Sequence, residues 1–245
     1  MAESTDVFGQ ALQDWARGGT DPETFERDDG FTETGVGHEL YVAPFAQWLS
    51  AERRAMRYVR GRVIDVGCAA GRVPLYLQQR GFDVVGVDSS PLAVRTARER
   101  GVMEARCLSA ADLRAEISSF DTVVLFGNNF GVFGTPGLLR RALTSWARRM
   151  PDGARILAGS TNPYCGGAPG LTRSYYFRNR RRGLMPGQVK LRIHYRSNVT
   201  PWFSWLFVSR LEMRELLRGT GWHQSRIMGG PSSEPYVAVL EKDGA

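Results

Sequence analysis

A short glycine turn between an expected strand and an expected helix constrains the fold more than any other feature of this sequence. The segment VIDVGCAAGR at 63–72 follows the start of an expected strand at 62–66, which delivers Asp65 near its end. Gly67 and Gly71 allow the backbone to turn tightly and to approach a ligand where a Cβ would clash. A helix over 73–80 is expected to follow. Because open parallel sheets bind ligands beyond the carboxyl ends of their strands, the turn marks a candidate binding site.

Strand and helix signals continue to alternate along the chain. Further strands are expected at 83–87, 104–108, 122–126, 154–158, 223–228 and 236–241. Helices are expected to open at Ser90–Pro91, at Thr135–Pro136 and at the Ser209/Glu212 capping box, because these residues are favoured at helix N-termini. The pattern predicts an α/β fold with a doubly wound, mostly parallel sheet of seven strands that ends in an antiparallel hairpin.

Two regions lie outside that core, which we expect to span 60–160 and 209–245. Residues 1–59 are expected to form an N-terminal arm and helical cap, with a loosely held polar arm over 1–37 that contains one short helix. In the cap, Tyr41, Phe45 and Trp48 recur at helical spacing, and Pro44 is expected to break the helix. Residues 161–208 hold Gly/Pro turns between the runs SYYFRNR, VKLRIHYR and TPWFSWLFV, which predict an antiparallel β insertion after the fifth strand.

The charged residues around the turn help to decide between two candidate ligands, a dinucleotide and S-adenosylmethionine. Asp88 ends the second strand roughly 20 residues after the turn, where an acidic side chain accepts hydrogen bonds from ribose hydroxyls. A dinucleotide site uses G-x-G-x-x-G so that a pyrophosphate rests on the helix N-terminus, whereas Asp65-x-Gly67-x-x-x-Gly71 places a carboxylate before the turn. A carboxylate repels a pyrophosphate but accepts hydrogen bonds from an ammonium group. S-adenosylmethionine (SAM) carries an ammonium and no phosphate, so the pattern favours SAM.

These residues resemble motif I of the class I, Rossmann-like SAM-dependent methyltransferases, Asp/Glu-x-Gly-x-Gly-x-Gly, followed by the acidic end of the second strand. Ala69 stands where the middle glycine is usual. Further similar segments are LSAADL at 108–113, FDTVVLFGNNFG at 120–131, PDGARIL at 151–157 and LLRGTGW at 216–222. The resemblance extends over 60–160 and 209–241, and it implies a methyltransferase that uses SAM.

The resemblance also implies which residues form the cofactor site: Asp65, Gly67, Cys68, Ala69, Gly71, Asp88, Ser89, Ser109, Ala110, Phe126 and Tyr41. The family usually places an Asp on the adenine amine at the position of Ser109, so here the backbone or Asp112 is expected to supply that contact. Tyr41 has two interpretations. It belongs either to a core aromatic stripe or to a ring face against the sulfonium, since aromatic faces attract cations.

Methyl transfer requires alignment of the acceptor with the methyl group, and it requires a general base only when the acceptor arrives protonated. The expected catalytic residues are His194 and Asn129, and the expected acceptor-binding residues are Asn128, Trp202 and Tyr164. The insertion at 161–208 is expected to cover the acceptor pocket. A small molecule with a hydroxyl or amine is the expected acceptor, with a thiol as a further option because thiols ionise near pH 8.5.

Charge and composition limit the partners. The net charge is +7, and much of it lies in the Arg178–Arg182 cluster, which is expected to be a solvated hairpin tip or an oligomer contact. An RNA methyltransferase that uses this basic insertion, and a non-catalytic SAM-binding protein, are the alternatives. The three cysteines lack metal-ligand spacing, and the sequence contains no apolar run long enough for a membrane helix. No metal, nucleic acid or membrane partner is therefore expected, an oligomer has no support, and the expected location is the cytoplasm.

Overall fold

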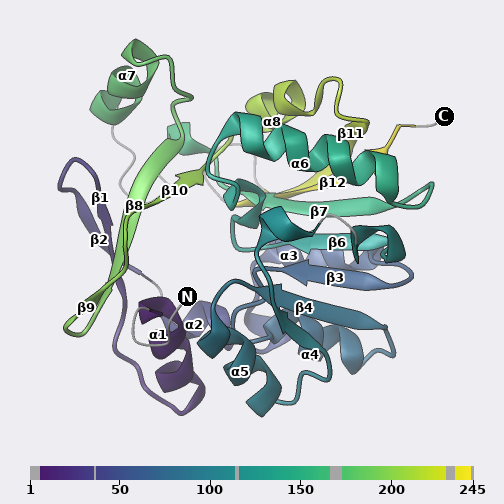
Figure 1. The fold of residues 1–245 in the computed structure, drawn as a ribbon, viewed down its shortest axis with the longest axis horizontal. Coiled ribbons are helices and arrows are strands. Elements are labelled where there is room, and N and C mark those ends of the chain that lie inside the picture. Colours follow the sequence, from purple (N-terminus) through teal and green to yellow (C-terminus); the bar gives the residue numbers. More distant parts are fainter. Residues whose placement is uncertain (1–5, 36, 114–115, 166–172, 230–234, 244–245) are drawn as a thin grey trace.

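The fold is built on a mixed sheet of seven strands, in the order β11-β12-β7-β6-β3-β4-β5 (Figure 1). The computed structural model describes residues 6–35, 37–113, 116–165, 173–229 and 235–243. In chain order the strands are β3 (Val63–Val66), β4 (Val84–Asp88), β5 (Ala105–Cys107), β6 (Thr122–Leu125), β7 (Arg155–Ser160), β11 (Trp222–Met228) and β12 (Tyr236–Lys242). The first five pair in parallel, and β12 pairs antiparallel with both β7 and β11. The predicted α/β fold with a mixed seven-stranded sheet is thereby confirmed.

Helices pack on both faces of this sheet because its strands are apolar on both sides. α6 (Pro136–Arg149) and α8 (Arg210–Leu217) bury Leu143, Trp146 and Met213 against one face. α3 (Ser50–Ala55) and α4 (Arg72–Gln78) cover the other, with α5 (Pro91–Glu99) beside β4 and β5. The predicted break at Pro44 separates α2 (His38–Tyr41) from the short 3-10 turn Phe45–Gln47. None of the helices in the described residues has the length and apolarity needed to cross a bilayer.

A second, antiparallel sheet stands beside the first, and in it strands of the N-terminal arm pair with strands of the insertion. Its order is β10-β8-β1-β2, with β9 paired to β8. The strands are β1 (Thr24–Arg27), β2 (Thr32–Thr34), β8 (Gln188–Tyr195), β9 (Asn198–Val199) and β10 (Phe203–Leu206). β1 pairs with β8 from Thr24 opposite His194 to Arg27 opposite Leu191. The prediction of a loosely held arm over 1–37 is therefore wrong. β1 and β2 are too short to show an alternation, and β8, the second partner of β1, is remote in sequence.

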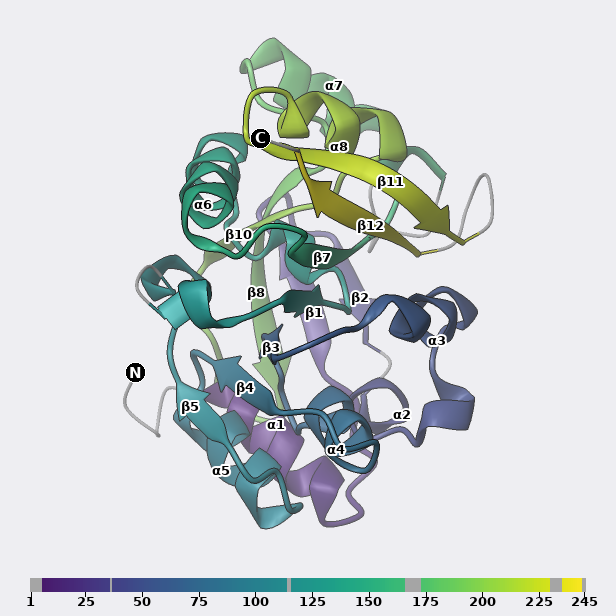
Figure 2. The same ribbon diagram turned by 90° about the vertical axis from the view of Figure 1, so that its right-hand side faces the viewer.

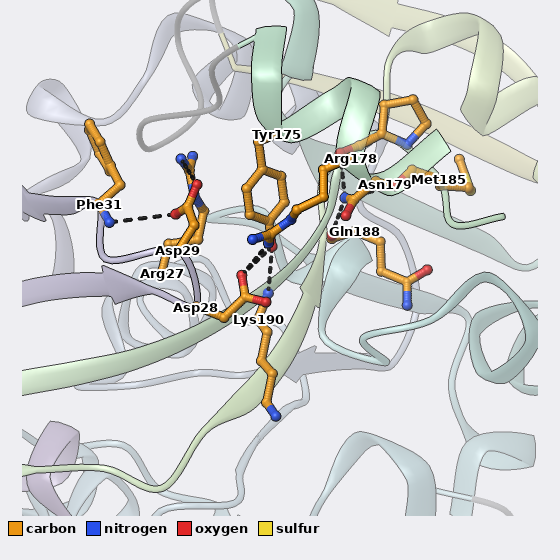
Figure 3. Close-up of polar contacts among 11 residues, drawn as sticks. Arg27, Asp28, Asp29, Phe31, Tyr175, Arg178, Asn179, Met185, Gln188 and Lys190 are labelled. Atoms are coloured by element: carbon orange, nitrogen blue, oxygen red, sulfur yellow. Dashed lines mark hydrogen bonds and ion pairs between the residues drawn. The ribbon is translucent and has the colours of Figure 1, made fainter. Parts of the chain in front are cut away.

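The run SYYFRNR lies in a helix rather than a strand. α7 spans Arg173–Arg181, and Tyr175, Tyr176 and Asn179 are buried along one of its sides. This run contains no β-branched residue, and its buried positions follow helical spacing. Figure 3 shows that Tyr175 and Arg178 both point at Asp28, at the tip of the β1–β2 hairpin, with the Tyr175 hydroxyl donating at 2.8 Å and Arg178 Nη2 at 2.7 Å. Part of the basic cluster is thus an internal contact between α7 and the arm.

The first helix docks the arm onto the core. α1 (Val7–Ala16) lies alongside α5, as Figure 2 shows. Asp6 caps α1 by accepting from the Gly9 amide at 3.0 Å. Its other oxygen accepts from the Ser90 hydroxyl at 2.6 Å and from the Leu92 amide at 3.0 Å, at the start of α5. One carboxylate therefore satisfies donors at two helix N-termini and fixes the arm next to the carboxyl end of β4.

Candidate functional site

The turn between β3 and α4 has the left-handed geometry that its sequence predicts. Gly67 has φ +76° and Gly71 has φ +81°, and both values favour glycine. Ala69, which stands at the usual middle glycine, also has a left-handed φ of +48°, a conformation that costs about 1–2 kcal/mol for a residue with a Cβ. A Cβ at position 67 would overlap the side-chain amide of Asn129. The turn is therefore closely packed against the loop after β6.

Asp88 lies across from this turn, at the end of β4. Its Oδ2 accepts from the Ala69 amide at 3.0 Å, and its Oδ1 accepts from the Ser90 amide at 3.0 Å. A carboxylate has about four acceptor sites, and the hydrogen bonds from these two amides occupy two of them. Burial raises the pKa of Asp88, and the amides of Ser90 and Ala69 oppose that rise. The carboxylate is thus held in one orientation by backbone amides, and it keeps acceptor capacity towards the cavity.

A buried ion pair flanks Asp65. Arg72 donates to Glu52 through Nη1 at 2.8 Å and through Nη2 at 2.9 Å, and it stacks on Trp48 with 4.6 Å from Cζ to the ring centroid. Asp65 itself is buried at the end of β3. Burial raises its pKa to about 7, and Asp88 and Glu52 add to that rise while Arg72 opposes it. Arg72 therefore places a fixed positive charge next to a carboxyl group that is poised to ionise.

These groups open into one cavity of about 1010 Å³ between the two sheets. It is lined by ten of the eleven residues predicted for the cofactor site: Asp65, Gly67, Cys68, Ala69, Asp88, Ser89, Ser109, Ala110, Phe126 and Tyr41. Gly71 lies behind the lining and begins α4. Of the two groups expected to replace the missing adenine contact, Asp112 accepts from the Ser109 hydroxyl at 2.6 Å and is not part of the lining. Ser109 and Ala110 themselves border the cavity.

Three of the five residues predicted for catalysis and acceptor binding also line the cavity: Asn128, Asn129 and Trp202. Asn129 donates through Nδ2 to the carbonyl oxygens of Val66 and Gly67, at 2.8 and 3.1 Å, so its amide supports the turn. Asn128 has φ +68°, and its Oδ1 accepts from the Thr161 hydroxyl at 2.6 Å.

The structure does not bring His194 or Tyr164 to the cavity, which corrects both predictions. On β8, Leu191 and Ile193 line the cavity, so His194 lies on the opposite face because strand residues alternate. There its Nε2 contacts Glu26 Oε2 at 2.6 Å. Tyr164 donates to Glu212 at 2.6 Å, outside the lining.

Three charged residues were missed by the sequence analysis: Arg72, its partner Glu52, and Glu23. Arg72 carried a signal, because it directly follows the glycine turn at the start of a helix. Glu52 carried none, since its partner lies on a separate helix. Glu23, just before β1, lines the cavity and is fully buried. Nothing in its local sequence distinguishes it from the other acidic residues of the arm.

Parts of this chain are similar in sequence to known proteins. Residues 63–153 match the methyltransferase domain family. The chain is 34% identical over 83 residues to a tRNA (uracil(54)-C(5))-methyltransferase of Pyrococcus horikoshii, covering 32% of this chain and 20% of that protein. It is 35% identical over 116 residues to a trans-aconitate 2-methyltransferase of Rhodococcus jostii, covering 46% of this chain and 42% of that protein. These matches span less than half of each relative's length.

A solved structure resembles the whole chain. The SAM-dependent methyltransferase of Bacteroides fragilis, crystallised with S-adenosylhomocysteine, superposes with a TM-score of 0.80. The alignment covers 99% of this chain and 97% of that one, at 21% identity. At this identity the likeness establishes a shared fold, and it includes both sheets rather than the core alone.

Proposed function

We propose that the chain transfers a methyl group from SAM to a small-molecule acceptor, because residues 63–153 match the methyltransferase domain family. The observation that carries the proposal is a single cavity that residues of both sheets line. One space between the sheets is bordered by the turn, by Asp88 and by the aromatic face of the second sheet. It can hold a nucleoside and an acceptor together.

The residues present fit SAM. The Asp88 carboxylate, held by two backbone amides, has the acceptor capacity for both ribose hydroxyls. Arg72 keeps donors beyond the two that it gives to Glu52, and these suit the methionine carboxylate. Asp65 suits the methionine ammonium, and the backbone at Ser109 and Ala110 suits the adenine edge. We propose that SAM lies along this row, with its sulfonium towards Tyr41.

The bound cofactor would supply an electrophilic methyl group on a positively charged sulfur. The chain's own part is to orient the acceptor and to exclude water. Phe25, Ile193 and Trp205 of the second sheet line the acceptor side of the cavity, together with Trp202, which directly precedes β10. We propose that the described residues of the insertion, 161–165 and 173–208, together with the β1–β2 hairpin of the arm, form the cover that determines which acceptor enters.

A small acceptor is favoured over RNA by the form of the site. Small-molecule sites are concave and mostly apolar, with volumes of roughly 300–1,000 Å³. RNA methylation would place basic residues along an open groove. Arg178 instead pairs with Asp28 and stacks on Tyr175, with 4.2 Å from Cζ to the ring centroid. The resemblance to a tRNA methyltransferase lies in part of the chain only.

The proposal is tested by incubating the protein with SAM labelled in its methyl group and with three fractions of a bacterial extract: metabolites, tRNA and protein. The expected result is label in the metabolite fraction alone, with S-adenosylhomocysteine as the second product. Label in the tRNA or protein fraction would show that the acceptor class is wrong. Absence of label in all three, despite SAM binding, would favour the non-catalytic alternative.

Replacing Trp202 by Ala should lower kcat/KM for the acceptor on the order of tenfold, equivalent to about 1.4 kcal/mol, because a rigid aromatic wall is lost. SAM affinity, measured by calorimetry, should stay within about twofold, because Trp202 is not among the residues proposed to hold SAM. His194→Ala, on β8, is the matched control. Its side chain faces away from the cavity, so turnover should be unchanged. Equal effects of the two substitutions would contradict the proposed cover.

A further inference from the structure

The Glu23 side chain is an unpartnered carboxyl group inside the cavity. It is 0% exposed, and neither Oε1 nor Oε2 has a hydrogen-bond partner among the described residues. Buried polar groups are nearly always hydrogen-bonded, because leaving one unpaired costs about 1–3 kcal/mol or more for a charged group. An unpaired carboxyl that lines a binding cavity therefore indicates a ligand that supplies its missing donors.

Two glycines of the arm, Gly35 and Gly37, pack against this carboxyl group. A Cβ at Gly35, at the end of the β1–β2 hairpin, would overlap the Glu23 side chain. A Cβ at Gly37 would lie 3.7 Å from Glu23 Oε2 and 3.8 Å from the Trp15 ring. Gly37 thus lies close to both the carboxyl group and Trp15, and Trp15 stacks on Tyr41 with 5.5 Å between ring centroids. Tyr41 lines the same cavity as Glu23.

Within the described residues, no positively charged side chain pairs with Glu23. Arg72 is engaged with Glu52, while Arg141 and Arg149 line the cavity from α6, on the other sheet. The other carboxylates have different surroundings: Asp65 and Asp88 border the nucleoside row, Asp6 is bonded to α5, and Glu33 is exposed. Burial raises the pKa of Glu23, and the nearby backbone amides of Glu23 and Gly37 oppose that rise, although neither amide meets hydrogen-bond geometry with a carboxylate oxygen.

We propose that Glu23 binds an ammonium group of the acceptor, and that the acceptor is therefore an amine attached to an apolar or aromatic body. The inference rests on the proposed methyltransferase function and names the substrate class of that same site. An ammonium supplies both the missing donors and the missing opposite charge, whereas a neutral hydroxyl supplies one donor and no charge. The aromatic lining adds to the preference because ring faces attract cations.

Glu23 would also take one proton from the bound amine. An ammonium nitrogen has no lone pair and cannot attack a methyl carbon. Transfer of one N–H proton to a Glu23 oxygen leaves that bond's electron pair on the nitrogen, so that a neutral amine faces a neutral carboxylic acid. A carboxyl group with a raised pKa is a better base for this step than an exposed one. The proton returns to solvent when the product leaves.

The test compares amines with alcohols of the same shape. The full chain, saturated with S-adenosylhomocysteine, is titrated calorimetrically at pH 7.5 with 2-phenylethylamine, tyramine and tryptamine, and with the corresponding alcohols. In the wild-type protein at least one amine should bind about tenfold more tightly than its alcohol, because bonds to a charged group are roughly twice as strong. Glu23→Gln should remove that preference while SAM affinity stays within about twofold.

Glu33→Gln is the matched control, because it removes an exposed carboxylate from the edge of the same cavity, and it should keep the preference. Glu23→Leu provides a second variant, which removes the buried polar group altogether and should also remove the preference. Wild-type protein that binds no amine better than its alcohol, including no binding of either, would overturn the inference while leaving SAM binding intact. So would a preference retained in Glu23→Gln, or a loss of SAM affinity in that variant. Failure of the wild-type chain to bind S-adenosylhomocysteine would instead refute the proposed function.

Discussion

Replacing Asp88 by Ala is expected to weaken SAM binding by about 10- to 100-fold, since hydrogen bonds to a charged group contribute about 1.5–3 kcal/mol. The substitution removes the acceptor proposed for both ribose hydroxyls. It also releases the Ala69 and Ser90 amides that the two carboxylate oxygens now bind at 3.0 Å. The turn that carries Ala69 then loses one of the hydrogen bonds that hold it in place. Isothermal titration of SAM into the two proteins at the same pH measures the effect.

Asp83→Ala is the matched control, because Asp83 precedes the same strand at its opposite end. It pairs with Arg62 at 2.9 Å and is largely exposed, and such surface pairs contribute about 0–1 kcal/mol. SAM affinity should therefore be unchanged in that variant. An affinity of Asp88→Ala equal to that of the wild type would remove Asp88 from the site and would contradict the proposed position of the ribose.

SAM affinity is expected to rise with pH between about 5.5 and 7.5, on the order of tenfold, because Asp65 titrates in this window. Burial raises the pKa of Asp65 to about 7, with Asp88 and Glu52 adding to the rise and Arg72 opposing it. A bound ammonium favours the ionised carboxylate, so binding lowers that pKa and releases a proton. Affinity therefore grows as the pH approaches the pKa of the free protein. The α-amino group of the ligand itself titrates only near pH 7.7–8.0.

The same group affects the ligand-free protein in the opposite direction. The folded protein holds the Asp65 proton more tightly than the unfolded chain, so its stability should fall as the pH rises from about 4 towards 7. Asp65→Asn should bind SAM more weakly and with a shallower pH dependence, and its thermal stability should lose part of this slope. The variant's titrations at several pH values check both effects. A slope in SAM affinity that persists unchanged in Asp65→Asn would assign the titration to another group.

The sequence predicted those parts of the molecule whose signals are local. The turn with Gly67, Gly71 and Asp65 could be identified because its residues are contiguous and each has a backbone or charge role. Asp88 lies one strand–helix unit further on, at a position that the parallel pairing of β3 and β4 brings alongside the turn. Strand and helix periodicity was enough for the seven-stranded sheet, since each element carries its own apolar pattern.

The parts that were missed depend on pairing between distant segments. β1 finds its partner β8 far along the chain, and its short length hides the alternation. That pairing decides which face of β8 the cavity meets, and so it turns His194 outward while Ile193 faces inward. Glu23 enters the cavity by the same pairing. Asp6 and Glu52 likewise act through contacts with α5 and α4, which a single sequence does not reveal.

The most direct test of the account is isothermal titration of the wild-type chain with SAM and, separately, with NAD at pH 7.5. The carboxylate before the turn, the Arg72 charge and the Asp88 acceptor predict that one SAM binds per chain and that NAD does not bind. Binding of NAD without SAM would contradict the account at its centre, because it would require a pyrophosphate to lie against Asp65.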